Sequence, residues 1–262
     1  MMTDIMLQVY VLGVGAVIGS FLNVLIYRLP KNQNFVTGRS HCPKCGTLIR
    51  WHDNIPIVSF LILRGKCRAC RAPISWRYPL IELLTAAFFL LAFRLYGFSP
   101  QTAIVSVFFC LLLVITAVDF QFYIIPDKIT VVGMILGMAA SFVSPIVKPL
   151  DALIGLIAGG ASLYLLALVG DFLFKKESLG GGDIKLAAML GAFLGWKSII
   201  IVFFGAAVLG LVYALIYMSF SRKMRQDRMI PFGPFLSLAA LIALFFGNCL
   251  IDLYVERVLA LQ

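Results

Sequence analysis

Long apolar runs recur along the whole of this 262-residue chain. Each run of about 17–25 residues is long enough, as a helix, to cross the hydrocarbon part of a bilayer. Hydrophobic residues make up 61% of the chain and charged residues 13%, whereas a soluble domain is about 45–50% apolar. The strict alternation expected of a membrane β-barrel is absent. The sequence therefore predicts an all-α membrane protein with about eight spans.

The predicted spans divide the chain into three parts. A first membrane helix occupies residues 1–28, a polar loop domain residues 29–78, and a larger membrane domain residues 79–262. The first apolar run lacks a basic start and a small-residue cleavage site, which indicates a retained span rather than a signal peptide. The spans are expected at residues 5–27, 79–96, 102–118, 128–143, 151–174, 184–194, 198–220 and 231–255.

The basic residues are unevenly distributed. The net charge is +10, and ten of the twenty-two Lys and Arg lie between Arg28 and Arg77. The positive-inside rule therefore predicts that residues 29–78 are cytoplasmic and that the N-terminus is outside. Loops that the alternating count places on the same side are also basic, with Lys175, Lys176, Arg222, Lys223, Arg225 and Arg228. Because lipid headgroups account for basic loops, no nucleic-acid partner is needed, although Trp51 and Trp76 could stack bases.

Four cysteines stand in two C-x-x-C pairs in the polar loop. Cys42 and Cys45 form the first pair, Cys67 and Cys70 form the second, and twenty-one residues separate the two pairs. This spacing is similar to that of a zinc ribbon, in which four thiolates hold one tetrahedral ion. A small loop with little core would gain its folding energy from the metal. The pattern favours a structural zinc site, because four cysteines leave no open coordination position.

Two aspartates lie at the ends of apolar runs. Asp183 follows three glycines in the segment ESLGGGDIKL (177–186), and Asp119 follows the apolar run 104–118. A carboxylate loses hydration in such a position, which indicates a function. By the alternating count both acids lie at the cytoplasmic edge of the membrane, so a meeting is expected.

Three further polar residues fall in or beside predicted spans. Asn23 is expected to make an interhelical hydrogen bond. Glu82 either caps a helix start or faces a polar site, and Asp127 either favours the helix start electrostatically or has a function. For Glu82 and Asp127 the sequence leaves both alternatives open.

A pair of adjacent aspartates suits peptide hydrolysis. One carboxylate keeps a proton while the other acts as a base on a water molecule. His41 and His52 are the only histidines, both lie in the cysteine loop, and no H-E-x-x-H motif is present, so serine, cysteine and zinc peptidases are not indicated. A proton-coupled transporter remains the alternative, although its charged groups usually lie near the membrane midplane.

An ordered series of motifs resembles the type IV prepilin peptidases, which are bifunctional leader peptidases and N-methyltransferases of bacterial type IV pilus and type II secretion systems. A related archaeal family, the preflagellin peptidases, should lack the cysteine loop. The motifs are GSFLNVLIYRLP (19–30), CPKC (42–45), NIPIVSFLILRGKCRAC (54–70), RYPLIE (77–82), DFQFYIIPD (119–127), G-x-G-D with KL (180–186) and PFGPFL (231–236).

The resemblance implies a bacterial inner-membrane aspartic endopeptidase that removes the leader of prepilins or pseudopilins on the cytoplasmic side. Methylation of the new N-terminal residue would follow, with S-adenosylmethionine as the donor. Carried over, Asp119 and Asp183 correspond to the catalytic pair, and Gly180 and Gly182 to its signature glycines. The cysteines Cys42, Cys45, Cys67 and Cys70 correspond to the zinc ligands, and Gly65 and Lys66 to candidate methyltransferase residues.

Overall fold

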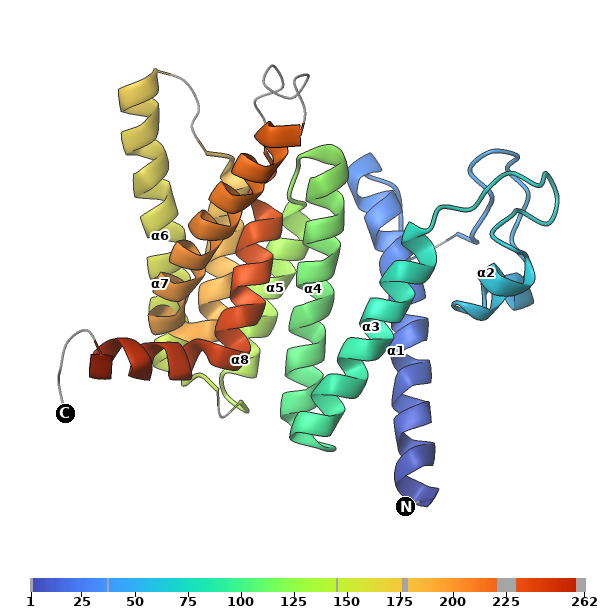
Figure 1. Cartoon of the computed structure of the whole chain (residues 1–262), viewed down its shortest axis with the longest axis horizontal. Helices are drawn as coiled ribbons and strands as arrows, with labels where there is room; N and C mark the ends of the chain where they lie inside the picture. Colours follow the sequence, from blue (N-terminus) through green and yellow to red (C-terminus); the bar gives the residue numbers. More distant parts are fainter. Residues whose placement is uncertain (1, 37, 145, 176–178, 221–229, 258–262) are drawn as a thin grey trace. The chain divides into compact units, whose positions relative to one another are not determined.

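The computed structural model describes residues 2–36, 38–144, 146–175, 179–220 and 230–257. Within these ranges the backbone forms α-helices, two short 3-10 helices (Leu29–Lys31 and Trp51–Asn54) and two isolated β-bridges, and no strand (Figure 1). The prediction of an all-α protein is confirmed. Glu177 and the loop residues Lys176, Arg222, Lys223, Arg225 and Arg228 lie outside the described residues. The α-helices are α1 (Met2–Arg28), α2 (Val58–Ile62), α3 (Arg77–Tyr96), α4 (Pro100–Phe122), α5 (Asp127–Ala140), α6 (Pro149–Phe174), α7 (Gly181–Phe220) and α8 (Gly233–Arg257).

Several of these helices are long and apolar enough to cross a membrane. Among the described residues there are five such stretches, in α1, α3, α4, α6 and α7. This makes the chain a multi-pass membrane protein. The predicted number of eight spans is not confirmed, because α5 has 14 residues, the apolar part of α8 is the shorter stretch Gly233–Gly247, and two predicted spans fall within α7.

Helix α7 is broken at Gly195, between the predicted spans 184–194 and 198–220. Gly195 has φ 76° and ψ 168°, a conformation that strongly favours glycine. Figure 1 shows that the helix changes direction between its two halves. The break lies against α6, since a Cβ on Gly155 would approach the carbonyl carbon of Gly195 to 2.8 Å. Packing against a glycine on α6 therefore accompanies the turn in α7.

The chain divides into two compact units, Met1–Val114 and Ile115–Gln262, with the division inside α4. In the first unit α1 packs on α3 through glycines. A Cβ on Gly15 would lie 2.7 Å from the Cα of Ala86, and one on Gly19 would lie 2.7 Å from the Cα of Glu82. The absence of side chains at these positions allows the close helix contact that small residues favour in membranes. The predicted boundaries at residues 28 and 78 stay a prediction.

In the second unit α6 and α7 pack closely in the same way. A Cβ on Gly191 would overlap the backbone carbonyl of Gly155, and one on Gly159 would overlap the carbonyl of Ala187. The α7 residues just before Gly191, from Leu186 to Leu190, are almost fully buried. The first half of α7 therefore forms the centre of this unit, with Asp183 at its beginning.

Candidate active site and metal-binding cluster

Asp119 lies in the last turn of α4 and is 5% exposed. Its Oδ2 accepts a hydrogen bond of 3.0 Å from the backbone N–H of Gly233, the first residue of α8. A Cβ on Gly233 would lie 2.7 Å from the same oxygen, so a larger residue would have to displace the carboxylate. The beginning of α8 therefore holds Asp119 in place.

Asp183 lies in the first turn of α7, and its backbone N–H donates to the carbonyl of Gly180 (3.0 Å). Its side-chain Oδ1 is buried and has no hydrogen-bond partner among the described residues. The Asp119 carboxylate is near enough to repel the Asp183 carboxylate electrostatically. A buried carboxylate oxygen without a donor is costly unless a proton or a bound water satisfies it.

One side chain, Ile125, joins the two aspartate sites. It lies in the short segment between α4 and α5. A Cβ on Gly182 would lie 2.8 Å from the Cβ of Ile125, and a Cβ on Gly233 would lie 3.1 Å from its Cδ1. Gly182 precedes Asp183, and Gly233 binds Asp119, so Ile125 packs against the backbone at both acids. The structure thus brings together two residues that are sixty-four positions apart in the sequence.

The three glycines before Asp183 have different surroundings. A Cβ on Gly180 would lie 3.2 Å from Oδ2 of Asp183, and Gly182 faces Ile125. A Cβ on Gly181 would meet nothing within 4 Å. A side chain would therefore be most restricted at Gly182, less restricted at Gly180 and unrestricted at Gly181.

An ion pair lies beside the aspartates. Lys185 Nζ, in the first turns of α7, is 2.6 Å from Oδ2 of Asp127, the first residue of α5. Asp127 is exposed and Lys185 half-exposed. For Asp127 the two interpretations, electrostatic stabilisation of the start of α5 and a functional role, both stay open. An acid at a helix start is favourable, and this one also binds α7. The reasoning from sequence missed Gly233, Ile125 and Lys185 as neighbours of the aspartates, although all three fall within the quoted motifs.

The four cysteines of the loop form one cluster. Their Sγ atoms all lie within 4.8 Å of one another, and those of Cys42 and Cys70 are 3.9 Å apart. A tetrahedral site with metal–sulfur bonds of about 2.3 Å has edges of about 3.8 Å. The donor set therefore fits a single metal ion, and the cluster can bind one. His41 and His52 do not belong to this cluster.

The cluster is built from two copies of one backbone turn, offset by 25 residues. In the first knuckle the N–H of Cys42 donates to Thr47 O, and in the second the N–H of Cys67 donates to Ala72 O. Matching β-bridges join His41 to Leu48 and Lys66 to Pro73. The residue after each second cysteine has positive φ, 71° at Gly46 and 58° at Arg71. Each turn therefore orients a pair of thiols in the same way.

Hydrogen bonds and crowding perturb these thiols. Hydrogen bonding to the hydroxyl and then to the backbone of Thr47 lowers the pKa of Cys45 to about 6. At Cys70 a backbone hydrogen bond from Ala72 favours the thiolate, but lost hydration and the other cysteines outweigh it and raise the pKa to about 11. Four crowded thiols cannot all ionise without a counter-charge. A dication supplies that charge, because metal binding releases protons from thiols.

Gly65 and Lys66 belong to the second knuckle. Gly65 has φ +66°, and a Cβ there would lie 3.1 Å from the Phe60 ring. Its carbonyl accepts a hydrogen bond from Ile74, which matches the bond from Ile49 to Ser40 in the first knuckle. The backbone of Lys66 pairs with Pro73, and its side chain is exposed. The turn thus gives Gly65 a structural reason to be glycine and leaves the Lys66 ammonium free to meet an anionic group.

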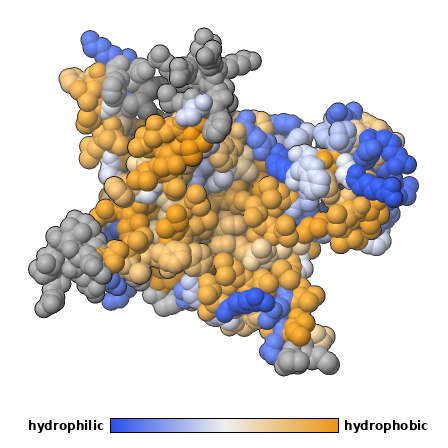
Figure 2. Space-filling view, in the orientation of Figure 1, coloured by the Kyte–Doolittle hydropathy of each residue, from blue (hydrophilic) through white to orange (hydrophobic). Residues whose placement is uncertain are grey.

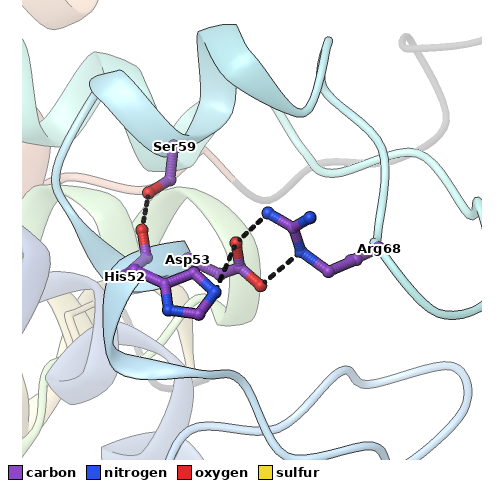
Figure 3. Close-up of polar contacts among 4 residues, drawn as sticks. All are labelled: His52, Asp53, Ser59 and Arg68. Atoms are coloured by element: carbon purple, nitrogen blue, oxygen red, sulfur yellow. Dashed lines mark hydrogen bonds and ion pairs between the residues drawn. The ribbon is translucent and has the colours of Figure 1, made fainter.

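An ion pair supports the loop between the knuckles. Arg68 donates two hydrogen bonds to the Asp53 carboxylate, at 2.6 and 2.8 Å (Figure 3). The Arg68 guanidinium holds the pKa of Asp53 below its usual value. The Ser59 hydroxyl donates to the carbonyl of His52 (2.8 Å), which attaches α2 to the preceding 3-10 helix. These contacts fold the segment between the cysteine pairs onto the second knuckle.

The polar residues at the α1–α3 contact are also placed. Asn23 Nδ2 donates to the carbonyl of Tyr78 on α3 (3.1 Å), so the predicted interhelical hydrogen bond is confirmed. Glu82 is 7% exposed, and its Oε2 accepts the backbone N–H of Ile57 at 2.8 Å. Glu82 therefore does not cap its own helix start, and instead binds the loop domain within the first unit.

These features define the class of the protein. It is a multi-pass helical membrane protein with a pair of aspartates in one unit, Asp119 buried and Asp183 half-buried, and a four-thiol metal-binding cluster in the other. A carboxylate pair of this kind suits acid–base hydrolysis.

Comparisons with known proteins identify the family. The bacterial peptidase A24 N-terminal domain matches residues 14–96, and the type IV leader peptidase family matches residues 106–215. A prepilin leader peptidase/N-methyltransferase of Myxococcus xanthus is 40% identical over 208 residues, which are 79% of this chain and 62% of that protein. Proteins of the same name from Xanthomonas campestris (35% identity, 93% of each chain) and Legionella pneumophila (34% identity, 91% of each chain) also match. No solved structure matches the chain significantly. The chain belongs to the type IV leader peptidase family.

Proposed function

We propose that this protein is a membrane aspartic endopeptidase that cleaves the leader peptide of type IV prepilins or pseudopilins and N-methylates the new N-terminal residue. The observation that carries the peptidase part is the pairing of Asp119 and Asp183, with Gly233 and Ile125 packed around them. The names of the relatives support both activities. The basic loops support an orientation with the site facing the cytoplasm, in the inner membrane of a bacterium.

In the proposed reaction the two carboxylates share one proton. The N–H of Gly233 stabilises negative charge on Asp119, so Asp119 acts as the base and removes a proton from a water molecule. The resulting hydroxide attacks the carbonyl carbon of the scissile peptide, while Asp183 donates its proton to the carbonyl oxygen. The tetrahedral intermediate then expels the amine, which takes the proton held by Asp119 as the C–N bond breaks, and a hydroxyl group of the intermediate returns a proton to Asp183 as the carbonyl group forms. The buried Oδ1 of Asp183, which lacks a partner among the described residues, suits a shared proton or this water.

The peptidase proposal is tested by Asp119→Asn and Asp183→Asn, with Asp127→Asn as the matched control. We expect leader cleavage to fall by about 100-fold or more in the first two variants, because each loses one partner of the acid–base pair. Asp127 is exposed and pairs with Lys185, so its variant should keep most of the activity. The measurement is cleavage of a prepilin in membranes that contain the full chain. Wild-type processing by either of the first two variants would refute the proposal.

The cysteine cluster supports a structural zinc ion held by Cys42, Cys45, Cys67 and Cys70. Cysteine thiolates suit zinc, and four of them complete a tetrahedron without an open position. The metal would therefore stabilise the loop and would take no part in hydrolysis. The metal content of the purified protein, compared between the parent and a variant with all four cysteines replaced by serine, tests this assignment.

Methylation of the new N-terminal amine would use S-adenosylmethionine, which supplies an activated methyl group. We propose Gly65 and Lys66 as contacts to this donor, because an exposed ammonium beside a glycine turn can pair with a carboxylate. Lys66→Ala should then lower methylation and leave leader cleavage unchanged. Lys44→Ala, in the first knuckle, is the matched control.

A further inference from the structure

Helix α2 presents apolar side chains outward. Val58, Leu61 and Ile62 are spaced i, i+3 and i+4, so they share one face of the helix. Leu61 is 66% exposed and Ile62 is 70% exposed. In a loop surrounded by water, such a face is expected to turn inward or to bind a partner.

Neighbouring residues enlarge this hydrophobic face. Ile55 and Trp51 are exposed just before α2, and Trp76 is exposed and packs against Phe60 of α2 with ring centroids 4.8 Å apart. Figure 2 shows a hydrophobic strip along the lower edge of the lobe that contains α2, below the hydrophilic surface of the knuckles. Tryptophan is enriched where membrane meets water, since its ring is largely apolar and carries one N–H donor.

A hydrogen bond fixes the start of α2 at a defined position along α3. The N–H of Ile57, just before α2, donates to Oε2 of Glu82 at 2.8 Å. Glu82 is the sixth residue of α3, inside the candidate span Arg77–Tyr96. At a rise of 1.5 Å per residue, this position lies about 7–8 Å along α3 from its first residue. Helices that lie in the membrane interface bury their apolar face to a similar depth, about 5–10 Å.

The backbone at the start of α2 is strained, and several of its N–H groups donate to other protein groups. Ile57 has φ 61° and ψ −50°, an unfavourable conformation for a β-branched residue, at the centre of a γ-turn closed by a bond from Val58 N–H to Pro56 O. The N–H of Ser59 donates to Ile55 O. At a helix start, backbone N–H groups often donate to water. Here the N–H groups of Ile57, Val58 and Ser59 donate to protein oxygens instead. This arrangement suits a helix that begins where water is scarce.

The charged residues beside α2 complement an anionic lipid surface. Arg64 and Lys66 follow α2, Arg50 precedes the 3-10 helix, and all three are exposed. The leucines Leu80, Leu83 and Leu84 of α3, in the same unit, are exposed as well. A basic rim above an apolar face is typical of helices that lie in the interface.

We propose that α2 is an interfacial helix, which inserts the face of Val58, Leu61 and Ile62 into the headgroup–acyl boundary of the bilayer that α1 and α3 cross. Glu82 is its positioning residue, because it binds the strained turn before the helix. The loop domain is thereby attached to lipid as well as to protein. This inference goes beyond the proposed function and requires neither of the two reactions.

Photo-crosslinking in vesicles tests the location of α2. The full-length chain, with p-benzoylphenylalanine at Leu61, is reconstituted into phosphatidylethanolamine and phosphatidylglycerol and irradiated. We expect lipid adducts by mass spectrometry at a yield within about threefold of that at Leu83 on α3, the positive control. Lys44, exposed in the first knuckle, should give at least tenfold less. A yield at Leu61 equal to that at Lys44, or crosslinks to a second copy in place of lipid, would overturn the proposal.

The role of Glu82 is tested with the same reporter at Leu61. Glu82→Gln keeps an acceptor for the Ile57 N–H, so the lipid adduct should persist. Glu82→Ala removes the acceptor and should lower the adduct at least fivefold while the metal content stays unchanged. Equal yields in both variants would exclude Glu82 as the positioning residue. If the alanine variant does not accumulate, the comparison of Leu61 with its two control positions in the parent chain still decides where α2 lies.

Discussion

The candidate catalytic carboxylates depend on residues that have no side chain. Asp119 is held by the N–H of Gly233, and a methyl group there would occupy the space of its Oδ2. Gly182 has a similar role for Asp183, since its Cα faces Ile125. The close packing of the backbone at Gly182 and Gly233 therefore helps to hold the two carboxylates in position.

Substitution within the glycine run should separate these roles. Gly182→Ala is expected to slow leader cleavage by about tenfold or more, because its Cβ would lie 2.8 Å from the Cβ of Ile125 and would displace Asp183. Gly181→Ala is the matched control, since a Cβ there meets nothing within 4 Å. The two rates are compared in membranes with equal amounts of each protein. If both variants cleave equally well, Ile125 does not position the site.

At the scale of single elements, the two cysteine knuckles form the clearest repeat in the structure. They share the same turn, bridge and positive-φ position, but that position is glycine in the first copy and arginine in the second. Arg71 therefore already accepts the strain that Gly46 avoids. This difference allows the backbone contribution to be measured separately from the ligands.

Gly46→Ala should weaken metal retention by about fivefold, because a left-handed conformation costs a side-chain residue about 1 kcal/mol. A Cβ at Gly46 meets nothing within 4 Å, so no steric contact confuses the result. Arg71→Ala adds no new strain and should retain metal as the parent does. Competition with a chromophoric chelator measures the metal affinity of each variant. Equal retention in the two variants would show that the turn conformation does not limit binding.

The Asp53–Arg68 pair should make the loop sensitive to acid. Arg68 lowers the pKa of Asp53 in the folded loop below its value in the unfolded chain. The pair therefore stabilises the fold above the unfolded pKa of about 4, and this contribution is lost as the pH falls through the folded value.

The variant Asp53→Asn isolates this effect. Its loop should be less stable than that of the parent at pH 7, and the difference should shrink as the pH falls below about 4. Protease resistance of the loop, measured across this range for both proteins, tests the expectation. A difference that does not depend on pH would mean that the ion pair contributes nothing.

At the scale of the whole molecule, the two candidate sites belong to different compact units. The four cysteines lie in the unit Met1–Val114, and Asp119 and Asp183 lie in the unit Ile115–Gln262. Each site is completed by contacts within its own unit, such as those of Asp53 with Arg68 and of Asp119 with Gly233. The two sites should therefore respond separately to local damage.

Metal removal tests this separation. Replacing Cys42, Cys45, Cys67 and Cys70 by serine should raise hydrogen exchange of backbone amides in residues 40–74, because the metal supplies the folding energy of this loop. Exchange in residues 184–194, at the centre of the other unit, should change little. Cys110→Ser, in α4 and away from the cluster, controls for loss of a thiol. An equal loss of protection from hydrogen exchange in both segments would contradict the expectation that the two sites respond separately.

Much of the molecule is predictable from local sequence. The length and apolarity of each run match the bilayer, so the helical membrane class and most helix positions follow from composition. The pairs Cys42–Cys45 and Cys67–Cys70 indicate a metal site by their spacing alone. Asp119 and Asp183 stand out because a carboxylate at the end of an apolar run is costly.

Other features depend on how the helices pack. The bond between Gly233 and Asp119 joins residues 114 positions apart, and the packing of Ile125 involves three separate segments. The turn at Gly195, which places two predicted spans in α7, accompanies the contact with Gly155. The start of α2 is bound to α3 by the hydrogen bond from Ile57 to Glu82, which joins residues 25 positions apart. The sequence by itself determined which segments are apolar and which residues carry chemistry, since those are local properties. Only the tertiary structure decided which of these residues come into contact. The contacting residues lie far apart in the sequence, and no regular spacing in the sequence indicates which distant segments will pack together.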